Sequence, residues 1–275
     1  MFKRSFQVCC RASCLILLMT HFPVFSSALP TIDCAKQVVL TQNHRPTLDD
    51  QQRDSYCAYQ FLQRYAPHGM LMVFGGETLE GSNREDYLLI QEFARRWTYS
   101  KASYTMPIVT GGAQGVMQAA TLGARQGRKD AIVLSLDVAI DIQGQVQPIG
   151  KYDIVKYTFV YRDISKREGD MINYANALVF GLGGIGTTWE LMETLVKITL
   201  GKISPVPIVI LAGSSQREFI DILHILIDRQ FVQRSLCQYV NYTSSVDKAL
   251  ALISMSFEAR KKDSTNLCHI KVHSS

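Results

Sequence analysis

The sequence predicts an α/β protein with a doubly wound, mostly parallel, Rossmann-like sheet and helices on both faces. Short apolar runs of strand length alternate along the chain with longer segments of helical period, which is the pattern of βαβ units. Glycine-rich turns follow three of these runs, at residues 75–76, 111–115 and 181–186. Because ligands bind at the carboxyl ends of the strands in this fold class, we expect the three turns to lie together at that edge.

The composition agrees with one globular domain of this class. The chain has 275 residues, of which 47% are hydrophobic and 19% are charged, and this length is sufficient for a complete core. The net charge of +5 is small and comes partly from the first eleven residues, so we expect no nucleic-acid binding. An acidic small-molecule substrate is compatible with this charge.

The first half of the chain contains repeated strand-turn-helix units after an N-terminal helix. Thr47 and Asp49-Asp50 open a helical pattern that ends before Pro67. The next expected elements are a strand at 70–74, a helix at 84–99, a strand at 107–110, a helix at 116–125 and a strand at 131–136.

The second half continues this alternation after a polar segment at 137–150, where we expect a loop. The remaining expected elements are a strand at 152–161, a short helix at 164–174, a strand at 177–180, a helix through Leu200, a strand at 206–211, an amphipathic helix at 217–232, a short strand near Tyr239 and a closing helix at 245–255.

The N-terminus has the features of a secretory signal peptide. Basic residues precede an apolar run from Ala12 to Val24, and Ser26-Ser27-Ala28 supplies the small residues that a signal peptidase accepts. The run is short and interrupted, so we expect no stable membrane anchor. The expected organisation is a signal peptide at 1–28, an arm and helix at 29–66, a catalytic domain at 67–258 and a charged tail at 259–275. The product would be exported, or cytoplasmic if the signal is not used.

Four cysteines would remain after removal of the signal: Cys34, Cys57, Cys237 and Cys268. In an exported protein they could form disulfides in any of three pairings, and free thiols are the alternative. The chain has no Cys-x-x-Cys spacing among them, and no histidine lies in the three glycine turns. We therefore expect neither a metal site nor a redox centre.

The stretch from Ala177 to Leu195 predicts an anion-binding site. A buried strand runs through Gly181, Gly183, Gly184 and Gly186 into Thr187 and a helical pattern. Glycines allow the backbone to approach an anion, and the free amides of the first helical turn favour negative charge. The same glycines satisfy the dinucleotide fingerprint G-x-G-x-x-G, but the next strand ends in Ala212-Gly213 without the acidic residue that would bind ribose hydroxyls. We therefore expect phosphate binding without a bound NAD-type cofactor.

Three segments carry a resemblance to a known family. They are FGGETLEGSNREDY from Phe74, VTGGAQGVMQAA from Val109 and REGDMINYANALVFGLGGIGTTWE from Arg167. They resemble the Lonely Guy family, long labelled "possible lysine decarboxylase", whose signature is Arg-x-x-x-Met followed by P-G-G-x-G-T-x-x-E. The resemblance extends from about Met70 to about Ile253.

The resemblance implies hydrolysis of the N-glycosidic bond of a nucleoside 5′-monophosphate, of the AMP or cytokinin-riboside type, to a free base and ribose 5-phosphate. It implies that Glu190 and Arg167 are catalytic. The residues expected to bind the substrate or its phosphate are Gly183, Gly184, Gly186, Thr187, Gly111, Gly112, Gly75 and Met171. The resemblance also implies a nucleotide as the small-molecule partner, a homodimer with the site near the subunit interface, and no cofactor.

The residue types fit this chemistry. Cleavage of a ribosyl bond passes through an oxocarbenium-like state, which a carboxylate near the sugar can stabilise. Glu190 is one helical turn inside the helix whose start would hold phosphate, and Arg167 could clamp phosphate or orient that glutamate. Simpler roles stay open: an acid that complements the helix dipole, a solvated surface arginine, and a packing turn at Gly111-Gly112.

The chain departs from the family pattern at two positions. Leu182 replaces the usual proline, and Glu168 stands where a lysine often follows the arginine. These changes would permit a second class of function, a nucleotide-binding module without catalysis. A pyridoxal-dependent lysine decarboxylase is a weaker alternative, because it needs a Schiff-base lysine in a cofactor pocket and the lysines lie outside the motifs.

Overall fold

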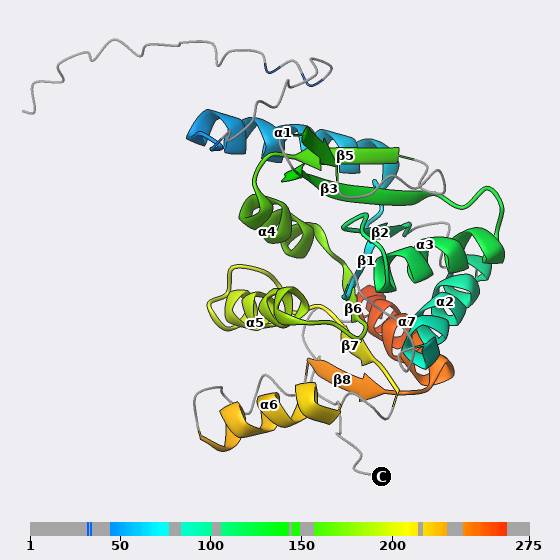
Figure 1. Cartoon of the computed structure of the whole chain (residues 1–275). Coiled ribbons are helices and arrows are strands. Elements are labelled where there is room, and N and C mark those ends of the chain that lie inside the picture. The colour runs from blue at the N-terminus through cyan, green and yellow to red at the C-terminus, as the bar shows by residue number, and fades with distance from the viewer. Residues whose placement is uncertain are drawn as a thin grey trace, which may run out of the picture. The chain divides into compact units, whose positions relative to one another are not determined.

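The computed structural model describes residues 45–76, 84–100, 106–142, 145–148, 157–213, 217–229 and 239–262, together with Ile32 and Cys34. All helices and strands belong to the compact unit Cys34–Ser275 (Figure 1). The helices are α1 (Leu48–Tyr65), α2 (Arg84–Tyr99), α3 (Val116–Gly127), α4 (Ile164–Tyr174), α5 (Ile185–Thr199), α6 (Arg217–Asp228) and α7 (Val246–Lys262). The strands are β1 (Leu71–Phe74), β2 (Ile108–Thr110), β3 (Val133–Ile142), β4 (Gln145–Pro148), β5 (Tyr157–Tyr161), β6 (Ala177–Phe180), β7 (Ile208–Leu211) and β8 (Val240–Thr243).

The strands form one sheet in the order β4-β3-β2-β1-β6-β7-β8, with β5 also paired to β3. β4 runs antiparallel to β3, and the other pairings are parallel. The chain winds outward from β1 through β2 and β3, returns to β6 on the other side of β1, and winds outward again through β7 and β8. This confirms the predicted doubly wound, mostly parallel sheet. The winding direction changes between β1 and β6, whose last residues, Phe74 and Phe180, are paired.

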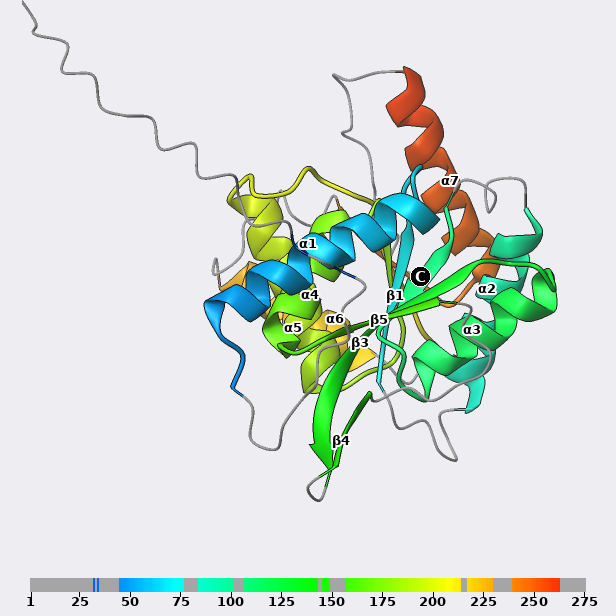
Figure 2. The ribbon, with the colours of Figure 1, turned by 90° about the horizontal axis from the view of Figure 1, so that it is seen from above.

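Helices cover both faces of the sheet, as the sequence predicts. Figure 2 shows α1, α4 and α5 on one side and α2, α3 and α7 on the other. Each layer has its own hydrophobic cluster, one with side chains from α1, α4 and α5 and the other with side chains from α2, α3 and α7. The central strands β1, β6 and β7 are therefore buried on both faces, which explains their continuous apolar sequences.

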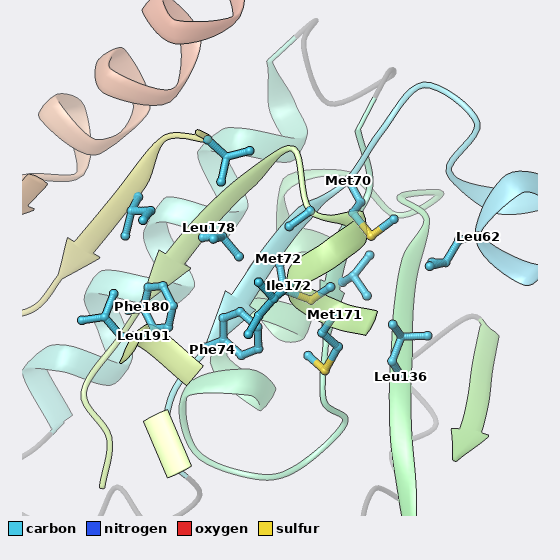
Figure 3. Close-up of a cluster of buried hydrophobic side chains, with 14 of the residues drawn as sticks. Leu62, Met70, Met72, Phe74, Leu136, Met171, Ile172, Leu178, Phe180 and Leu191 are labelled. Atoms are coloured by element: carbon cyan, nitrogen blue, oxygen red, sulfur yellow. The ribbon is translucent and has the colours of Figure 1, made fainter. Parts of the chain in front are cut away.

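Alternate residues of a central strand belong to opposite layers. In β1, Leu71 and Val73 belong to the cluster with α2, α3 and α7, whereas Met72 and Phe74 belong to the cluster with α1, α4 and α5. Figure 3 shows the latter cluster, in which Met171 of α4 lies among the side chains of the sheet. The core on this side thus fixes α4 and α5, the two helices that carry the predicted catalytic residues.

The loop predicted at 137–150 is wrong, because β3 continues to Ile142 and pairs with β4. Asp137 and Val138 extend the parallel pairing of β3 with β5, opposite Val160 and Tyr161. The polar residues there alternate with apolar ones, which is the period of a strand with two different faces. In this segment the alternation therefore determines the structure, and the polar composition does not indicate a loop.

Helix α1 begins where the sequence predicts. Thr47 is its N-cap and forms a capping box: Asp50 N donates to Thr47 Oγ1 at 3.2 Å, and Thr47 N donates to Asp50 Oδ2 at 2.9 Å. A disulfide joins Cys34 to Cys57 of α1, so one bond of the predicted disulfide framework is present. Cys237 and Cys268 lie outside the described residues.

Several other predictions also fall outside the described residues, including the signal peptide at 1–28 and the tail beyond Lys262. Residues 259–262 belong to α7, so the predicted tail begins as helix. The part of the chain that the structure describes contains no helix long and apolar enough to cross a membrane.

Candidate active site

Backbone hydrogen bonds join the turns that follow β1, β6 and β2. Gly76 N donates to the Leu182 carbonyl at 2.7 Å, and Gly181 N donates to the Phe74 carbonyl at 2.9 Å. Val116 N, at the start of α3, donates to the Gly76 carbonyl at 3.1 Å. The three glycine turns therefore lie together at the carboxyl edge, as predicted, at the point where the winding direction changes.

Close packing requires glycine at some of these positions. A Cβ on Gly75 would overlap Val116, and a Cβ on Gly183 would overlap Thr187 and lie 2.9 Å from Gly76 N. Gly112 adopts a φ of 82°, which favours glycine, and a Cβ there would overlap Ser135 Oγ. Gly75 and Gly112 are both buried, so a side chain at either position would disturb the packing around the turns.

The N-terminus of α5 is open to solvent. Its N-cap, Gly184, makes no side-chain capping bond, and Gly184, Ile185 and Gly186 are all exposed. A Cβ on Gly184 or Gly186 would have no atom within 4 Å. Uncapped amides and the helix dipole favour an anion at such a position. The predicted phosphate turn therefore has room and hydrogen-bond donors for a phosphate.

The two threonines of this turn differ in their surroundings. Thr187 is buried directly beneath Gly183. Thr188 Oγ1 donates to the carbonyl of Gly184 at 3.0 Å, so that hydroxyl is already used inside the helix. Thr187, the residue that the signature assigns to binding, thus lies under the turn and Thr188 stabilises the helix start.

Arg167 on α4 reaches the second glycine turn. A Cβ on Gly111 would lie 3.3 Å from Arg167 Nη1 and 3.1 Å from Met117 Sδ, so the guanidinium packs closely against this turn. Arg167 is 8% exposed, which excludes the alternative of a solvated surface arginine. Its Nη2 donates to Glu168 Oε1 at 3.3 Å, and its buried Nε has no hydrogen-bond partner among the described residues.

Glu190 on α5 is also 8% exposed, so it is not a surface acid that merely complements the helix dipole. The pKa of its carboxyl is raised to about 8, chiefly by burial; the positive charge of Arg167 opposes this increase, and the negative charges of Glu168 and Glu193 add to it. Glu190 is therefore mostly protonated at neutral pH. Arg167 on α4 is near enough to influence the charge of Glu190 on α5, so the two predicted catalytic residues lie in the same region of the site.

Met171 does not fit its predicted role in binding. Its side chain is fully buried in the hydrophobic cluster between α4 and the sheet (Figure 3). Met171 therefore packs α4 against the strands, and Arg167, one turn earlier on the same helix, faces the site. The motif identifies both positions correctly as belonging to α4 but does not distinguish a core residue from a ligand-binding one.

Two groups of polar residues near the site are not predicted by the sequence motifs. Ser135 and the fully buried Asp137 lie beneath Gly112, at the carboxyl end of the parallel part of β3. A loop at 137–150 would have placed Asp137 away from the sheet, so the alternation in β3 is the signal that could have found it. Glu193 and Lys197 form an ion pair of 2.8 Å on α5, and the one signal for it is their spacing of i and i+4.

A cavity of about 340 Å³ lies near the amino ends of β1 and β6, at the edge of the sheet opposite to the glycine turns. It is lined by residues of α1, the end of α4 and the segment before β1, among them Tyr59, His68, Tyr174 and Asn176. None of the predicted site residues lines it. The candidate site is therefore defined by its side chains and helix termini and is separate from this cavity.

Comparison with known proteins supports the resemblance. The sequence profile of the family described as "Possible lysine decarboxylase" matches residues 114–253, just over half of the chain. No curated protein matches the chain significantly. Among solved structures, the molybdenum cofactor carrier protein of Chlamydomonas reinhardtii is similar at 20% identity, with a TM-score of 0.49 and coverage of 69% of this chain and 98% of that chain. The molybdenum cofactor binding protein of Rippkaea orientalis is similar at 15% identity, with a TM-score of 0.48 and coverage of 67% of this chain and 93% of that chain.

The matched region includes α4, the glycine turn after β6 and α5, and therefore both Arg167 and Glu190. Its extent is sufficient to assign the family from sequence. The chain belongs to the possible lysine decarboxylase family, which is also known as the Lonely Guy family.

Proposed function

We propose that the protein hydrolyses the N-glycosidic bond of a nucleoside 5′-monophosphate and releases a free base and ribose 5-phosphate. The observation that carries this proposal is a buried carboxyl, Glu190, one turn inside the open start of α5 and under the influence of the buried Arg167. One phosphosugar could place its phosphate at the helix start and its ribose at Glu190. Family membership supports a nucleotide phosphoribohydrolase or a related activity.

The phosphate would bind at the first turn of α5. Gly184 and Gly186 present backbone without side chains, and the amides there are uncapped. Arg167 would supply the positive charge, because its guanidinium lies against the neighbouring turn at Gly111 and its Nε has no hydrogen-bond partner in the part of the chain that the structure describes. These features explain why a nucleotide should be preferred to a nucleoside.

Glu190 would supply the proton that the leaving base needs. With a pKa of about 8 it is protonated at neutral pH, and it can donate its proton to the base nitrogen as the C1′–N bond breaks and its electron pair moves to that nitrogen. The carboxylate that remains would stabilise the positive charge on the sugar. It would then accept a proton from the water that attacks C1′, which restores the acid.

A comparison of AMP with adenosine tests this proposal. Purified protein is incubated with each, and adenine and ribose 5-phosphate or ribose are separated by chromatography. We expect adenine from AMP and much less from adenosine, because adenosine lacks the anion that α5 would bind. Equal turnover of the two substrates would contradict the phosphate site, and no release from either would contradict the glycosidase.

A nucleotide-binding module without catalysis is the second candidate. The observation that favours it is the ion pair between Arg167 and Glu168, which neutralises part of the charge that a substrate would use. Binding of AMP in calorimetry, without release of adenine, would support this candidate over the enzyme.

A further inference from the structure

Five charged residues gather where α4 faces α5. Arg167 and Glu168 come from α4, and Glu190, Glu193 and Lys197 come from α5. Lys197 does not pair with Glu168 or Glu190. Its Nζ lies 2.8 Å from Glu193 Oε1 and donates to the carbonyl of Gly169 at 3.0 Å. Lys197 therefore neutralises Glu193. The positive charge of Arg167 acts on the two remaining carboxyls of the group, those of Glu168 and Glu190.

The ion pair of Arg167 is with Glu168. Arg167 Nη2 and Glu168 Oε1 are 3.3 Å apart, and the two side chains are only 9% and 4% exposed. The other oxygen, Glu168 Oε2, is buried and has no hydrogen-bond partner within the described ranges of the chain. A buried carboxylate with one cation and an unsatisfied oxygen exerts a strong electrostatic effect on its neighbours, because little water screens it.

We propose that Glu168 is a positioning residue whose ion pair with Arg167 leaves less of that positive charge to Glu190 and so keeps the Glu190 carboxyl protonated. Two consequences of the contact act in the same direction: Glu168 withdraws part of the positive charge of Arg167 from Glu190, and it adds a negative charge of its own beside Glu190. The proposal concerns the ionisation of Glu190, and only its effect on rate rests on the proposed function.

Other charged groups do not replace Glu168 in this role. Arg167 and Glu168 face Glu190 from α4, and Glu193 faces it from α5. Glu193 is paired with Lys197. Asp163, whose charge also acts on Glu168, caps the N-terminus of α4, where its Oδ1 accepts a hydrogen bond of 2.7 Å from Lys166 N. Glu168 is thus the acid that shares the cation of Glu190.

The sign of the effect follows from these charges. Burial raises the pKa of Glu168 above its ordinary value, and the charge and hydrogen bond of Arg167 reduce this increase without cancelling it. In Glu168→Gln, the negative charge beside Glu190 disappears and the guanidinium becomes free to approach Glu190. Both changes favour the Glu190 carboxylate, so the pKa of Glu190 should fall from about 8.

The test is a direct titration of Glu190. Protein labelled with ¹³C at the glutamate carboxyl carbon is followed by NMR between pH 4 and 10, and the Glu190 signal is assigned by its loss in Glu190→Gln. In Glu168→Gln the midpoint should fall by roughly one unit or more. Glu92→Gln is the matched control, because Glu92 is on α2 and forms an exposed ion pair with Arg95. This control should leave the midpoint unchanged.

An unchanged or higher midpoint in Glu168→Gln would overturn the proposal, as would an equal shift in Glu92→Gln. If Glu168→Gln does not fold, Glu168→Ala is the second variant. It also removes the carboxylate, so the Glu190 midpoint must fall, and an unchanged value overturns the proposal. The pH profile of base release is the second readout, with its alkaline limb at lower pH in Glu168→Gln. Absence of base release from every protein would contradict the proposed function, and the titration alone would then decide the role of Glu168.

Discussion

The carboxyl of Glu190 holds its proton more tightly in the folded protein than in the unfolded chain, because burial raises its pKa from 4.5 to about 8. Its contribution to stability is therefore complete below pH 4.5 and is lost as the pH rises through about 8. We predict that the free energy of unfolding falls between pH 5 and pH 9 by a few kcal/mol more in the unaltered protein than in Glu190→Gln. Urea unfolding at both pH values measures this, and identical pH dependence would contradict the burial of an ionisable group here.

Arg167→Ala tests whether the guanidinium of Arg167 contributes to binding and cleavage of the nucleotide. The substitution removes the cation beside Gly111 and leaves the buried Glu168 carboxyl without its ion pair. We expect AMP to bind more weakly and to be cleaved more slowly, each by roughly tenfold or more, because loss of a phosphate clamp affects both steps. Arg95→Ala, at an exposed arginine on α2, is the control. Unchanged binding of AMP by a folded Arg167→Ala would mean that Arg167 does not contact the nucleotide.

Single residues of the site can be predicted only as far as a motif position identifies them. Arg167 and Glu190 are expected from the motif to act together, and both are buried at the predicted edge. The pairing of Arg167 with Glu168 is not predictable, because adjacent residues of a helix do not face each other and only the long arginine side chain allows the contact. The motif does not say which side chains of α4 face the core, so it could not predict that Met171 is fully buried there.

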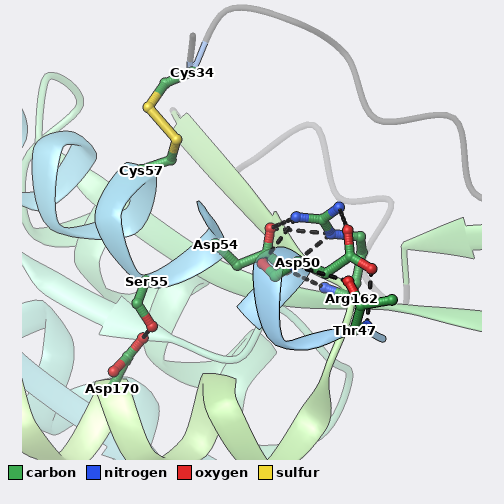
Figure 4. A network of polar contacts seen from close by, with 8 residues as sticks. All are labelled: Cys34, Thr47, Asp50, Asp54, Ser55, Cys57, Arg162 and Asp170. Carbon is green, nitrogen blue, oxygen red and sulfur yellow. Dashed lines mark hydrogen bonds and ion pairs between the residues drawn. A yellow bond between two sulfur atoms is a disulfide. The ribbon is translucent and has the colours of Figure 1, made fainter. Parts of the chain in front are cut away.

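At the scale of elements, α1 is fixed to the helix that carries Arg167. Arg162, just before α4, pairs with Asp54 Oδ1 at 2.6 Å and with Asp50, and all three side chains are largely buried (Figure 4). Ser55 Oγ of α1 donates to Asp170 Oδ2 of α4 at 2.6 Å. These contacts join residues more than a hundred positions apart in the sequence, so they could not be predicted from local patterns.

We predict that Arg162→Met destabilises the protein by roughly 3 to 5 kcal/mol, because it leaves buried carboxylates without their cation. Arg95→Met, which breaks the exposed pair with Glu92, should cost less than about 1 kcal/mol. Chemical denaturation of the two variants measures the difference. Similar losses in both would show that the Arg162 cluster does not stabilise the attachment of α1.

The predictability of the other elements follows from their burial. Strands β1, β6 and β7 are buried on both faces, so each has a continuous apolar run that is easily recognised in the sequence. The extension of β3 and its hairpin with β4 lie at the edge of the sheet and alternate polar with apolar residues. Over so few residues, alternation indicates a strand less clearly than a continuous apolar run does. The β3 extension and β4 are therefore harder to predict from the sequence than β1, β6 and β7.

At the scale of the whole molecule, the homodimer implied by the resemblance is a proposal, and α5 offers a surface for it. Ile185, Trp189, Val196 and Leu200 are exposed large apolar residues at helical spacing along α5, beginning at the glycine turn. We propose that a second copy of the chain covers this row. Val196→Glu should then give monomers, because the charge would be buried at the interface. Light scattering after size-exclusion chromatography measures the mass, and an unaltered protein that is monomeric at micromolar concentration would refute the proposal.

Glu190 is the group that we propose cleaves the ribosyl bond, and Glu190→Gln tests this role most directly. Glutamine keeps the shape and hydrogen bonding of the side chain but cannot donate and recover the proton. The measurement is release of adenine from AMP by both proteins, together with the affinity of each for AMP. We predict that release falls by roughly 10²-fold or more while binding is retained. Release of adenine by Glu190→Gln at the rate of the unaltered protein would contradict the assignment of Glu190 as the catalytic acid.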